Sequence, residues 1–367
     1  MATTVFVTRK FPPSVGGMET LASDVWQALE STADVPVRLI ALGRSQRLLP
    51  LWLPVAVARV VALVLARRVD RVVVGDVLLY LLIGPVLRVL RVPHTTMAMG
   101  KDVVWTQPVY QRVVARWLPR APHVLAISAA TAAAVVAAGV PPERVQVVRL
   151  GVAVPGVDGQ ADGADRAERA AALRRRLGVA DGTVVLLTLG RLVRRKGVEW
   201  FVRTVLPELP ASVVYVVAGH GPDAERVAAA VRATGQERRV HLLGAVSEAD
   251  REALMSGVDV FVQPNIPVPG DMEGFGLVAV EAAMRGALVV AADLEGLRDA
   301  VLPGETGLLV PAQDQAVWVE QLTALADDPV ARAAQARELA ARCRELYSRD
   351  RMGRDLCEAL GLPVRST

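Results

Sequence analysis

The sequence has few of the residues that bind metals, form disulfides or fill an aromatic core. Two of its 367 residues are cysteine, four are histidine, and aromatic residues make up 4%. Cys343 and Cys357 have no metal-ligand spacing, so neither a zinc site nor a disulfide framework is indicated. Two free thiols fit a reducing cytoplasm. The core must be aliphatic, in agreement with a hydrophobic fraction of 52%.

A secretory signal is also missing. Met1–Thr8 has no basic segment followed by an apolar stretch, so we expect a cytoplasmic protein. The one near-membrane segment, Leu48–Ala66, contains Pro50, Pro54 and Arg59, which we expect to interrupt a spanning helix. We predict a loop followed by a buried or interfacial helix there. Surface contact with a bilayer stays open.

The charge is uneven along the chain, although the net charge is only +4. Residues 1–155 carry 17 Lys/Arg against 8 Asp/Glu, a balance of +9, and the remainder carries 25 against 30, a balance of −5. A basic half fits an anionic partner, such as a phospholipid surface or a phosphorylated acceptor. A solvated arginine-rich surface explains the same numbers. We expect no nucleic-acid partner.

Short Val/Leu runs alternate with Ala/Arg-rich stretches, a pattern that predicts an α/β fold with parallel sheets buried on both faces. Residues 1–160 and 170–343 are predicted to form two Rossmann-like domains, separated by a Gly/Asp/Ala-rich linker at Pro155–Ala170. Helices are expected from about Glu19, over Ala129–Ala138, and from about Asp314 to Leu360. Strands are expected at Thr4–Val7, Val37–Ala41, Val72–Gly75, Thr95–Ala98, Val124–Ile127, Val145–Val148, Val184–Leu189, Val213–Ala218, Val240–Leu243, Val258–Val262, Leu288–Ala291 and Gly307–Val310.

The densest motif is Glu273-Gly-Phe-Gly-Leu-Val-Ala-Val-Glu281. We predict a glycine-rich loop that carries Glu273, then a helix starting near Phe275 with Glu281 about two turns in. A helix N-terminus offers unpaired N–H groups to a diphosphate, and its glycines let the backbone approach a ligand closely. Glu273 can accept sugar hydroxyls and Glu281 ribose hydroxyls. A capped helix with a solvated Glu281 is the alternative.

The second motif is Gly190-Arg-Leu-Val-Arg-Arg-Lys-Gly197, directly after an apolar strand. Loops at the carboxyl ends of parallel strands are where α/β proteins place ligands. Arg191 and Lys196 can converge on a pyrophosphate and neutralise the leaving diphosphate as a glycosidic bond breaks. A plain basic surface loop is the alternative, with Arg194 and Arg195 as the solvated pair.

Two more glycine-rich turns follow strands. Gly219-His-Gly-Pro222 lacks the third glycine of a dinucleotide fingerprint and is interpreted as a structural turn. The loop Phe11–Glu19 contains Gly16 and Gly17, which permit backbone approach to a phosphate or sugar at the start of a helix. A simple tight turn is the alternative.

Taken together, these motifs resemble glycosyltransferase family 4, the retaining group 1 enzymes of GT-B fold. The matching segments occur in the order and with the spacing of the family, and they extend over almost the whole chain. They are the Gly16-Gly17 loop, Gly100-Lys101-Asp102, Ser128-Ala-Ala-Thr131, Gly151-Val152, Gly190 to Gly197, Gly219 to Pro222, Leu243-Gly244-x-Val246, Glu273 to Glu281 and Gly304 to Pro311. The resemblance implies two Rossmann-like α/β/α domains facing across a cleft, an N-terminal acceptor domain and a C-terminal donor domain. A C-terminal helix at about 344–362 would brace the first.

The resemblance also implies roles for individual residues. Arg191 and Lys196, after Gly190, match the pair that binds the donor diphosphate, and Glu273 matches the residue that contacts the donor sugar. A further set matches the remaining donor contacts: Phe275, Gly276 and Leu277 as backbone N–H donors, Glu281 for the ribose, Val246 for the base, and Gly16 and Gly17 on the opposite wall.

Two positions depart from the family pattern: Arg149 precedes Leu150-Gly151-Val152 where Asn-Gly-Val is usual, and the other is Met99. Such enzymes commonly carry a His-Gly pair after the fourth strand, and here Met99 stands where that histidine is usual. Met99 cannot donate a hydrogen bond to a sugar. His94 lies five residues earlier, at the beginning of the strand, so we expect it to be structural. Asp102 or Lys101 is the candidate replacement, and Asp102 is included among the predicted catalytic residues.

The predicted activity is retaining transfer of a hexosyl or N-acetylhexosaminyl group from a UDP- or GDP-linked donor to an acceptor hydroxyl. The acceptor is a lipid-linked glycan or a natural product. No pair of carboxylates suggests a double displacement, and no Asp-x-Asp or His/Cys cluster suggests a metal, so no cofactor is expected. Two alternatives stay open: a sugar-nucleotide epimerase, and a donor-binding partner subunit without catalysis.

Overall fold

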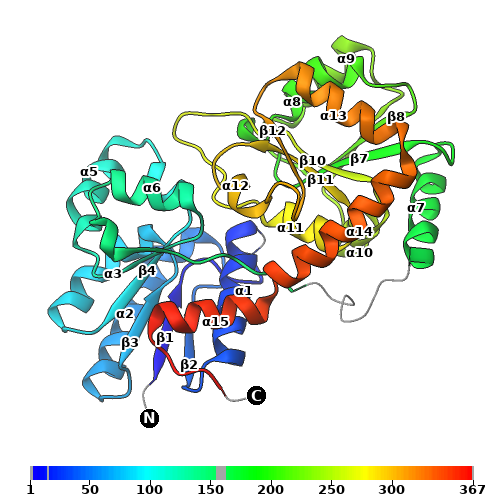
Figure 1. The fold of residues 1–367 in the computed structure, drawn as a ribbon. Helices are drawn as coiled ribbons and strands as arrows, with labels where there is room; N and C mark the ends of the chain where they lie inside the picture. The colour runs from blue at the N-terminus through cyan, green and yellow to red at the C-terminus, as the bar shows by residue number, and fades with distance from the viewer. Residues whose placement is uncertain (1–2, 15, 154–162, 366–367) are drawn as a thin grey trace. The chain divides into compact units, whose positions relative to one another are not determined.

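The computed structural model describes residues 3–14, 16–153 and 163–365, with side chains from residue 166 in the last range. The chain forms two compact units (Figure 1). The first comprises residues 1–153, Pro269–Phe275 and Tyr347–Thr367, and the second comprises Val154–Val268 and Gly276–Leu346. The sequence assigns residues 269–275 to the second domain, whereas in the structure they pack with the first unit. The segment Pro155–Ala170 is predicted to be a linker and the start of a helix: residues 155–162 lie outside the described residues, and the helix begins at Gly163.

The first unit is built on a six-stranded parallel sheet in the order β2-β1-β3-β4-β5-β6. Its strands are β1 (Thr4–Thr8), β2 (Val37–Ala41), β3 (Arg71–Val74), β4 (His94–Ala98), β5 (Val124–Ala126) and β6 (Val145–Val147). Its α-helices are α1 (Gly17–Thr32), α2 (Leu49–Leu65), α3 (Val77–Val89), α4 (Lys101–Val104), α5 (Pro108–Trp117), α6 (Ala129–Ala137) and α15 (Arg349–Leu360). Short 3₁₀ segments are η1 (Gln46–Leu48), η2 (Leu118–Arg120) and η3 (Pro142–Arg144).

The second unit contains another six-stranded parallel sheet, in the order β12-β11-β10-β7-β8-β9. Its strands are β7 (Val184–Leu189), β8 (Val213–Ala218), β9 (Val240–Gly244), β10 (Val260–Gln263), β11 (Leu288–Asp293) and β12 (Leu308–Pro311). Its α-helices are α7 (Gly163–Leu177), α8 (Val198–Trp200), α9 (Ala224–Thr234), α10 (Glu248–Gly257), α11 (Leu277–Met284), α12 (Leu297–Ala300), α13 (Gln315–Asp327) and α14 (Pro329–Leu346). Short turns of helix are η4 (Arg194–Lys196), η5 (Phe201–Val205) and η6 (Leu206–Glu208).

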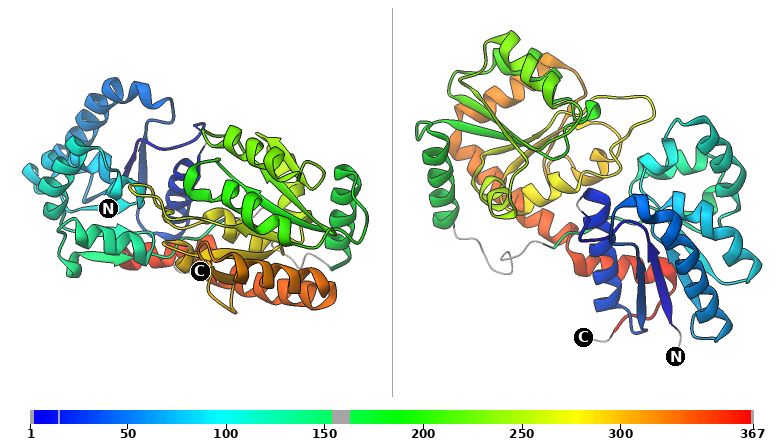
Figure 2. Two further views of the ribbon diagram at one scale, coloured as in Figure 1. Left: turned by 90° about the horizontal axis from the view of Figure 1, so that it is seen from above. Right: turned by 180° about the vertical axis from the view of Figure 1, so that it is seen from behind.

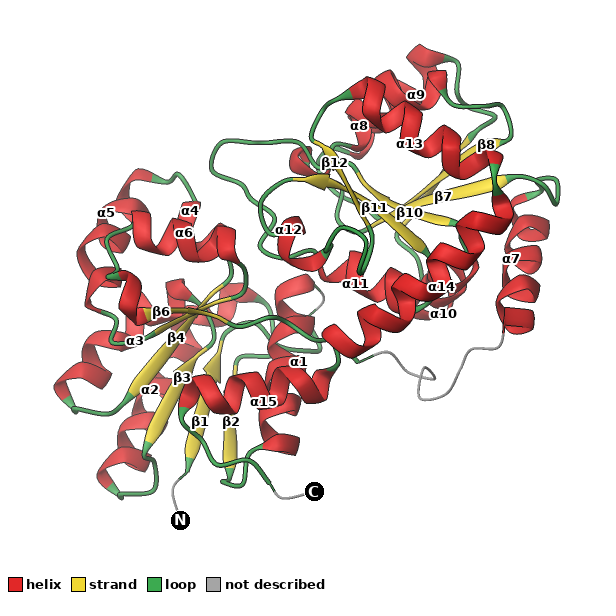
Figure 3. Cartoon of the chain, in the orientation of Figure 1, coloured by secondary structure: helices red, strands yellow, loops and turns green. Residues whose placement is uncertain are grey.

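Helices flank each sheet (Figures 2 and 3), and the central strands are buried, whereas edge strands such as β6 and β9 are partly exposed. The first strand of each unit, β1 or β7, is buried along its whole length. All twelve predicted strands are present, each within two residues of its expected ends. Their Val/Leu runs identify them because parallel strands that are covered on both faces are apolar throughout rather than alternating.

The prediction for Leu48–Ala66 is wrong in one respect: α2 is a continuous helix from Leu49. Pro50 lies in the first turn, where the missing N–H has no helical partner to lose. Pro54 lies inside the helix, where it removes one backbone hydrogen bond without ending it. Of the two predicted alternatives, a buried helix is excluded, because Ala56 and Val60 are the only buried residues of α2, and the interfacial helix stays a prediction.

The C-terminal helix α15 packs along α1 within the first unit (Figure 1). Gly353 allows the close approach, since a β carbon there would lie 2.2 Å from the Thr32 hydroxyl and 2.9 Å from the Ala28 carbonyl oxygen. Arg349 pairs with Asp24 of α1 at 2.7 Å. The end of the chain is therefore an integral part of the first unit.

A half-buried carboxylate joins three elements of the second unit. Asp259, just before β10, accepts the Val185 N–H at 2.8 Å and pairs with Arg174 at 2.6 Å and Arg332 at 3.3 Å. These arginines come from α7 and α14. Because buried charges are stable only when paired, the three side chains fix both helices to the end of the sheet.

Each unit contains one cysteine. Cys343 lies in α14 and Cys357 in α15, and both are free thiols that are fully buried. Burial raises the pKa of Cys343 to about 12 and also raises the pKa of Cys357. Neither thiol is a nucleophile in the folded chain, since the thiolate is the reactive form.

The packing of α15 predicts that Gly353→Val lowers the free energy of unfolding by about 1–3 kcal/mol, because the added side chain overpacks the contact with α1. Urea unfolding followed by circular dichroism measures the change. Gly182→Val is the control, because a β carbon at Gly182 meets no atom within 4 Å. Equal stability of the two variants would contradict the assignment.

Candidate functional site

Each sheet has one place where the strand order reverses, and open α/β sheets bind ligands beside the carboxyl ends of the strands at that place. In the second unit this is the crevice between β7 and β10. In the first unit it lies between β1 and β3. The Gly190–Gly197 loop follows β7 and the Gly16-Gly17 loop follows β1. Topology thus places both predicted loops at switch points.

The loop after β7 rests on the glycine-rich turn after β8. A β carbon on Gly219 would lie 1.9 Å from the Gly190 carbonyl oxygen, and one on Gly221 would lie 2.1 Å from the carbonyl oxygen of Leu192. No side chain fits at either position. The turn is therefore structural, as the sequence indicates, and it supports the segment that carries Arg191.

The two predicted cations of this loop differ in exposure. Arg191 is exposed and forms no ion pair with another described residue, whereas Lys196 is 8% exposed. Lys196 ends η4 directly before Gly197, whose φ of 64° is left-handed. A β carbon on Gly197 would lie 1.8 Å from the Pro264 carbonyl oxygen. The loop after β7 is therefore held against the segment after β10, at the switch point itself.

Glu281 lies on α11, which follows β10 in the chain. The helix begins at Leu277, with Gly276 at φ 103° before it, so Glu281 is just over one turn in rather than two. Glu281 is buried and forms a short salt bridge with Arg251 of α10. Burial lowers the pKa of Arg251, but the charge and hydrogen bond of Glu281 outweigh this effect, and the pKa is raised. The Arg251 guanidinium is thus held in its charged form.

Val246, predicted to lie near the nucleotide base, falls between β9 and α10 and is half-buried. The next residue, Ser247, caps α10 by accepting the Asp250 N–H at 3.1 Å. The cap fixes the backbone at Val246 relative to the helix that carries Arg251. The base-binding role of this backbone stays a prediction.

The loop that carries Glu273 packs on the first unit. A β carbon on Gly274 would lie 2.3 Å from the Met99 carbonyl oxygen, and Gly270 is similarly close to Thr106. Lys101 pairs with Asp271 of the loop at 3.0 Å. Glu273 itself is 8% exposed. The loop is thus fixed beside the turn that replaces the usual His-Gly pair.

Phe275 closes this loop with an edge-to-face contact on Tyr347, at 5.9 Å between ring centroids. Both rings are buried. The predicted role of Phe275 uses its backbone N–H, which this ring contact leaves unaffected.

The Gly16-Gly17 turn precedes α1. A β carbon on Gly16 would lie 2.5 Å from an oxygen of the Glu19 carboxylate, which pairs with Lys10 at 2.9 Å. A β carbon on Gly17 would meet no atom within 4 Å. A glycine at position 16 therefore leaves room for the Lys10–Glu19 ion pair. The backbone at Gly17 stays open to a ligand.

Asp102 is predicted to contact a sugar, but the structure gives its carboxylate other partners. Its side chain is buried, and its two oxygens accept the N–H groups of Val77 at 2.9 Å and Met99 at 2.8 Å. Burial, followed by the nearby charge of Asp76, raises the pKa of Asp102 to about 7, although the two N–H donors and Arg9 oppose the shift. The carboxyl group thus ties the Met99 turn to the first turn of α3.

His94 lies at the beginning of β4 and is buried. Its Nδ1–H donates to the Val92 carbonyl oxygen at 2.8 Å, and its ring stacks on Tyr80 at 6.0 Å between centroids. Burial lowers its pKa, which favours the neutral ring. These contacts support the structural role expected for His94.

The predicted site residues are divided between the units. Gly16, Gly17, Asp102, Glu273 and Phe275 belong to the first unit, and Gly190, Arg191, Lys196, Val246, Gly276, Leu277 and Glu281 belong to the second. Across the described ranges, no group of three or more His, Cys, Asp or Glu side chains is arranged to hold a metal ion.

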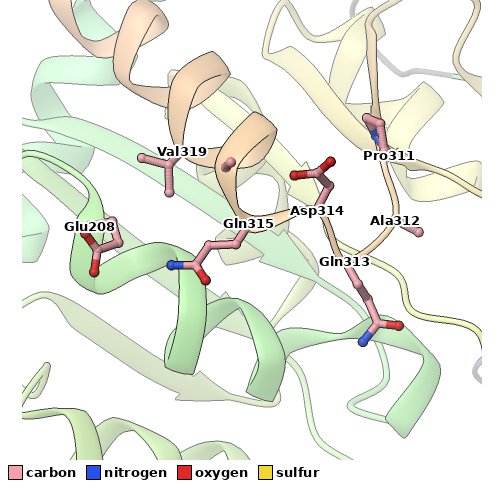
Figure 4. Close-up of a pocket in the computed structure, with 8 residues that line it drawn as sticks. Glu208, Pro311, Ala312, Gln313, Asp314, Gln315 and Val319 are labelled. Carbon is pink, nitrogen blue, oxygen red and sulfur yellow. The ribbon is translucent and has the colours of Figure 1, made fainter.

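A shallow pocket elsewhere in the second unit contains none of the predicted residues. It lies between η6 and the start of α13, where Glu208, Gln313 and Gln315 line it (Figure 4). Asp314, which also lines it, accepts the Val317 N–H at 3.3 Å as the cap of α13. The pocket is therefore separate from the predicted donor-binding residues.

Sequence reasoning missed Arg251, Asp271 and Lys10, which hold Glu281, Lys101 and Glu19 respectively. All three partners lie outside the motif segments. No spacing signal indicates such pairs, because they form only when the chain folds.

Two family models match the chain in succession. "Glycosyltransferase Family 4" matches residues 15–154, and "Glycosyl transferases group 1" matches residues 183–328. The first match lies almost entirely in the first unit, and the second lies in the second unit except for residues 269–275. Together they include every predicted site residue.

Curated relatives match about half of the chain. The D-inositol 3-phosphate glycosyltransferase of Corynebacterium glutamicum is 33% identical over 190 residues, 49% of this chain and 44% of that protein. The phosphatidyl-myo-inositol mannosyltransferase of Mycobacterium leprae is 36% identical over 154 residues, 40% of this chain and 38% of that protein. The matches thus span less than half the length of either relative.

Solved structures match almost the whole chain. Anabaena Alr3699/HepE in complex with UDP and glucose has a TM-score of 0.76 at 22% identity, covering 98% of this chain and 100% of that one. Sucrose-phosphate synthase from Thermosynechococcus elongatus has a TM-score of 0.75 at 19% identity, covering 98% of each chain. These likenesses show the fold, two α/β units of GT-B type. With the successive family matches and the parallel sheets, they establish that the chain belongs to the group 1 glycosyltransferases of family 4.

Proposed function

We propose that this protein transfers a hexosyl or N-acetylhexosaminyl group, with retention, from a UDP- or GDP-linked donor to an acceptor hydroxyl. The observation that carries the proposal is the Arg191–Lys196 loop at the switch point of the second sheet, locked against the segment after β10 by Gly197. A cationic loop in this position suits a diphosphate. The UDP complex of the Anabaena neighbour supports a nucleotide-linked donor.

The donor is bound mainly by the second unit in this scheme. Arg191 and Lys196 pair with the diphosphate, and the N–H groups at Gly276 and Leu277, at the start of α11, point to the same charge. Glu281 accepts the ribose hydroxyls. Its salt bridge with Arg251 holds the side chain in place, and its carboxylate oxygens are hydrogen-bond acceptors.

The remaining donor contacts involve backbone and one carboxylate. Gly190 and the backbone at Val246 provide the approach to the phosphates and the base, and Phe275 donates its N–H. Glu273 accepts hydroxyls of the donor sugar. Because Glu273 is buried and its loop is fixed on the Met99 turn, its position is set before a donor binds.

The chemistry proceeds by front-face substitution. The acceptor oxygen attacks the anomeric carbon on the face from which the diphosphate leaves. The carbon–oxygen bond to the β-phosphate breaks, and that phosphate oxygen keeps the electron pair and takes the acceptor proton. Arg191 and Lys196 stabilise the charge that develops on the leaving group, so no protein nucleophile and no metal cofactor is needed.

The acceptor is a lipid-linked glycan or a soluble natural product, and the open backbone at Gly17, beside Gly16, adds to the donor contacts from the first unit. A cytoplasmic protein, peripheral to the inner face of the membrane, fits the balance of +9 over residues 1–155. The names of the relatives, which specify D-inositol 3-phosphate and phosphatidyl-myo-inositol, support a phosphorylated or lipid acceptor.

Asp102 has a positioning role in this proposal. Through the Met99 N–H it fixes the turn whose carbonyl oxygen faces Gly274, the residue next to Glu273. It therefore acts on the sugar-binding loop indirectly. With Asp102 in this role, Met99 need not supply the hydrogen bond that the usual histidine donates.

The first prediction is that Arg191→Ala and Lys196→Ala each lower kcat about 100-fold or more, because each removes a cation from the leaving diphosphate. A thermal-shift screen against UDP-, GDP-, ADP- and TDP-sugars selects the donor, and release of nucleoside diphosphate measures the rate. Arg194→Ala is the matched control from the same loop, because Arg194 is exposed and paired with Glu199 at 2.6 Å. We expect it to stay within about twofold of the wild type.

Two results would reject the proposed activity. Conversion of the donor alone to an epimer, seen by NMR, would favour an epimerase. Donor binding by calorimetry with neither hydrolysis nor transfer would favour a non-catalytic partner subunit.

The second prediction is that an excess of EDTA leaves the transfer rate within about twofold of the untreated protein, because the leaving group is neutralised by side chains. Rates are compared before and after dialysis against the chelator. A large loss that added Mg²⁺ or Mn²⁺ restores would show that a metal takes part.

The third prediction concerns pH. An acid whose pKa is higher in the folded than in the unfolded chain stabilises the fold at low pH, and this contribution is lost as pH rises from about 4 to about 7. The stability advantage of the wild type over Asp102→Asn should therefore be largest near pH 4 and shrink towards pH 7. Urea unfolding at several pH values measures it, with exposed Asp350→Asn as control. An advantage that grows with pH would refute the assignment.

A further inference from the structure

Helix α2 has the composition of a buried or membrane helix but lies at the surface. The segment Gln46–Leu65 has a mean hydropathy of 2.3, and only 11% of its most apolar window is buried. A helix that is hydrophobic on all sides is normally enclosed by protein or lipid. In the first unit α2 is covered on one side only.

The covered side of α2 is part of the core of the first unit. Ala56 and Val60 are buried, and Leu53 and Val57 pack against the same core. Together with Val7 of β1, this side forms one apolar layer. The inner face is thus permanently occupied by protein.

The outer face of α2 is apolar as well. Leu51 is 75% exposed, Val55 51% and Leu65 70%. With exposed Ala58 and Ala62 they are spaced by four, three, four and three residues, which places them on one side of an α-helix. A soluble surface helix normally presents polar side chains there, so this face lacks its partner.

The charge around α2 indicates the nature of that partner. Residues 42–69 contain no Asp or Glu but five arginines, all exposed and none in an ion pair with a described residue: Arg44, Arg47, Arg59, Arg67 and Arg68. In a symmetric dimer the same patch faces itself, so these arginines would meet arginines. An anionic lipid surface supplies the opposite charge.

The geometry favours lying on a bilayer over crossing it. The 20 residues Gln46–Leu65 are long and apolar enough to cross a membrane, so length does not decide between the two arrangements. The inner face, however, is packed on the core of the first unit, and Arg59 is exposed midway along the helix. An apolar strip flanked by arginines matches the pattern of an interfacial helix.

We propose that the outer face of α2 docks on an anionic phospholipid bilayer, with Leu51, Val55 and Leu65 in the interface and the surrounding arginines among the lipid headgroups. The inference identifies the surface for the membrane contact in the proposed function and to that extent rests on it. Vesicle binding is measured without any sugar donor. A protein that does not bind vesicles can therefore be distinguished from one that does not transfer sugar.

The experiment is co-sedimentation of the full chain with vesicles of phosphatidylglycerol and phosphatidylcholine in equal amounts, and with vesicles of phosphatidylcholine alone. We expect at least tenfold stronger partitioning to the anionic vesicles in 0.1 M salt, weakened in 0.5 M salt. Leu51→Glu should weaken it at least tenfold. Val330→Glu is the matched control, because Val330 lies on α14 of the second unit and is 78% exposed.

A second pair of variants tests the charges. Arg44→Glu/Arg47→Glu should weaken partitioning at least tenfold, whereas Arg238→Glu/Arg337→Glu, two exposed positions of the second unit, should not. Circular dichroism and urea unfolding establish that each variant is folded.

The proposal is overturned if the wild type does not partition to anionic vesicles, or if Leu51→Glu partitions as well as Val330→Glu. It is also overturned if the wild type is a dimer in solution that Leu51→Glu converts to monomers, because the outer face would then bind a second copy. Vesicle binding with unchanged donor turnover for Arg191→Ala would support the surface and reject the proposed catalytic role.

Discussion

The pairing of β7 with β10 is the contact on which the candidate donor site depends. Val260 and Phe261 pair with Leu186 and Leu187. At one end Asp259 accepts the Val185 N–H. At the other, the Thr188 hydroxyl donates to the Val262 carbonyl oxygen at 2.5 Å and accepts a hydrogen bond from Tyr215 at 2.6 Å. These buried polar contacts fix the two strands side by side, and only then do the loops that follow them meet at Gly197 and Pro264.

The proposed donor machinery is built from backbone geometry as much as from charged side chains. Gly197, Gly219 and Gly221 each contact another segment's carbonyl oxygen at a distance that excludes any β carbon. These contacts leave little freedom for the loop that carries Arg191 and Lys196. Charge neutralisation by a loop of fixed shape requires less reorganisation than by mobile side chains, which suits a reaction whose leaving group is a diphosphate.

Much of the fold could be predicted from the sequence, because parallel strands covered on both sides are apolar runs with clear ends. The motif loops could also be assigned to strand ends, since the resemblance and the glycine pattern agree. The structure differs where a residue's role depends on tertiary partners. Pro54 is tolerated inside α2, Asp102 is buried against backbone N–H groups, and residues 269–275 pack with the first unit. None of these contacts has a local sequence signal, and neither does the pairing of Arg251 with Glu281.

The placement of the two cysteines has a practical consequence. Cys343 belongs to the second unit and Cys357 to the first, and both thiols are shielded and protonated in the folded chain. An alkylating reagent can therefore reach each sulfur only when the surrounding helix opens. Mass spectrometry of the two alkylated peptides would record the opening of each unit separately. The wild-type protein suffices, because no cysteine has to be introduced.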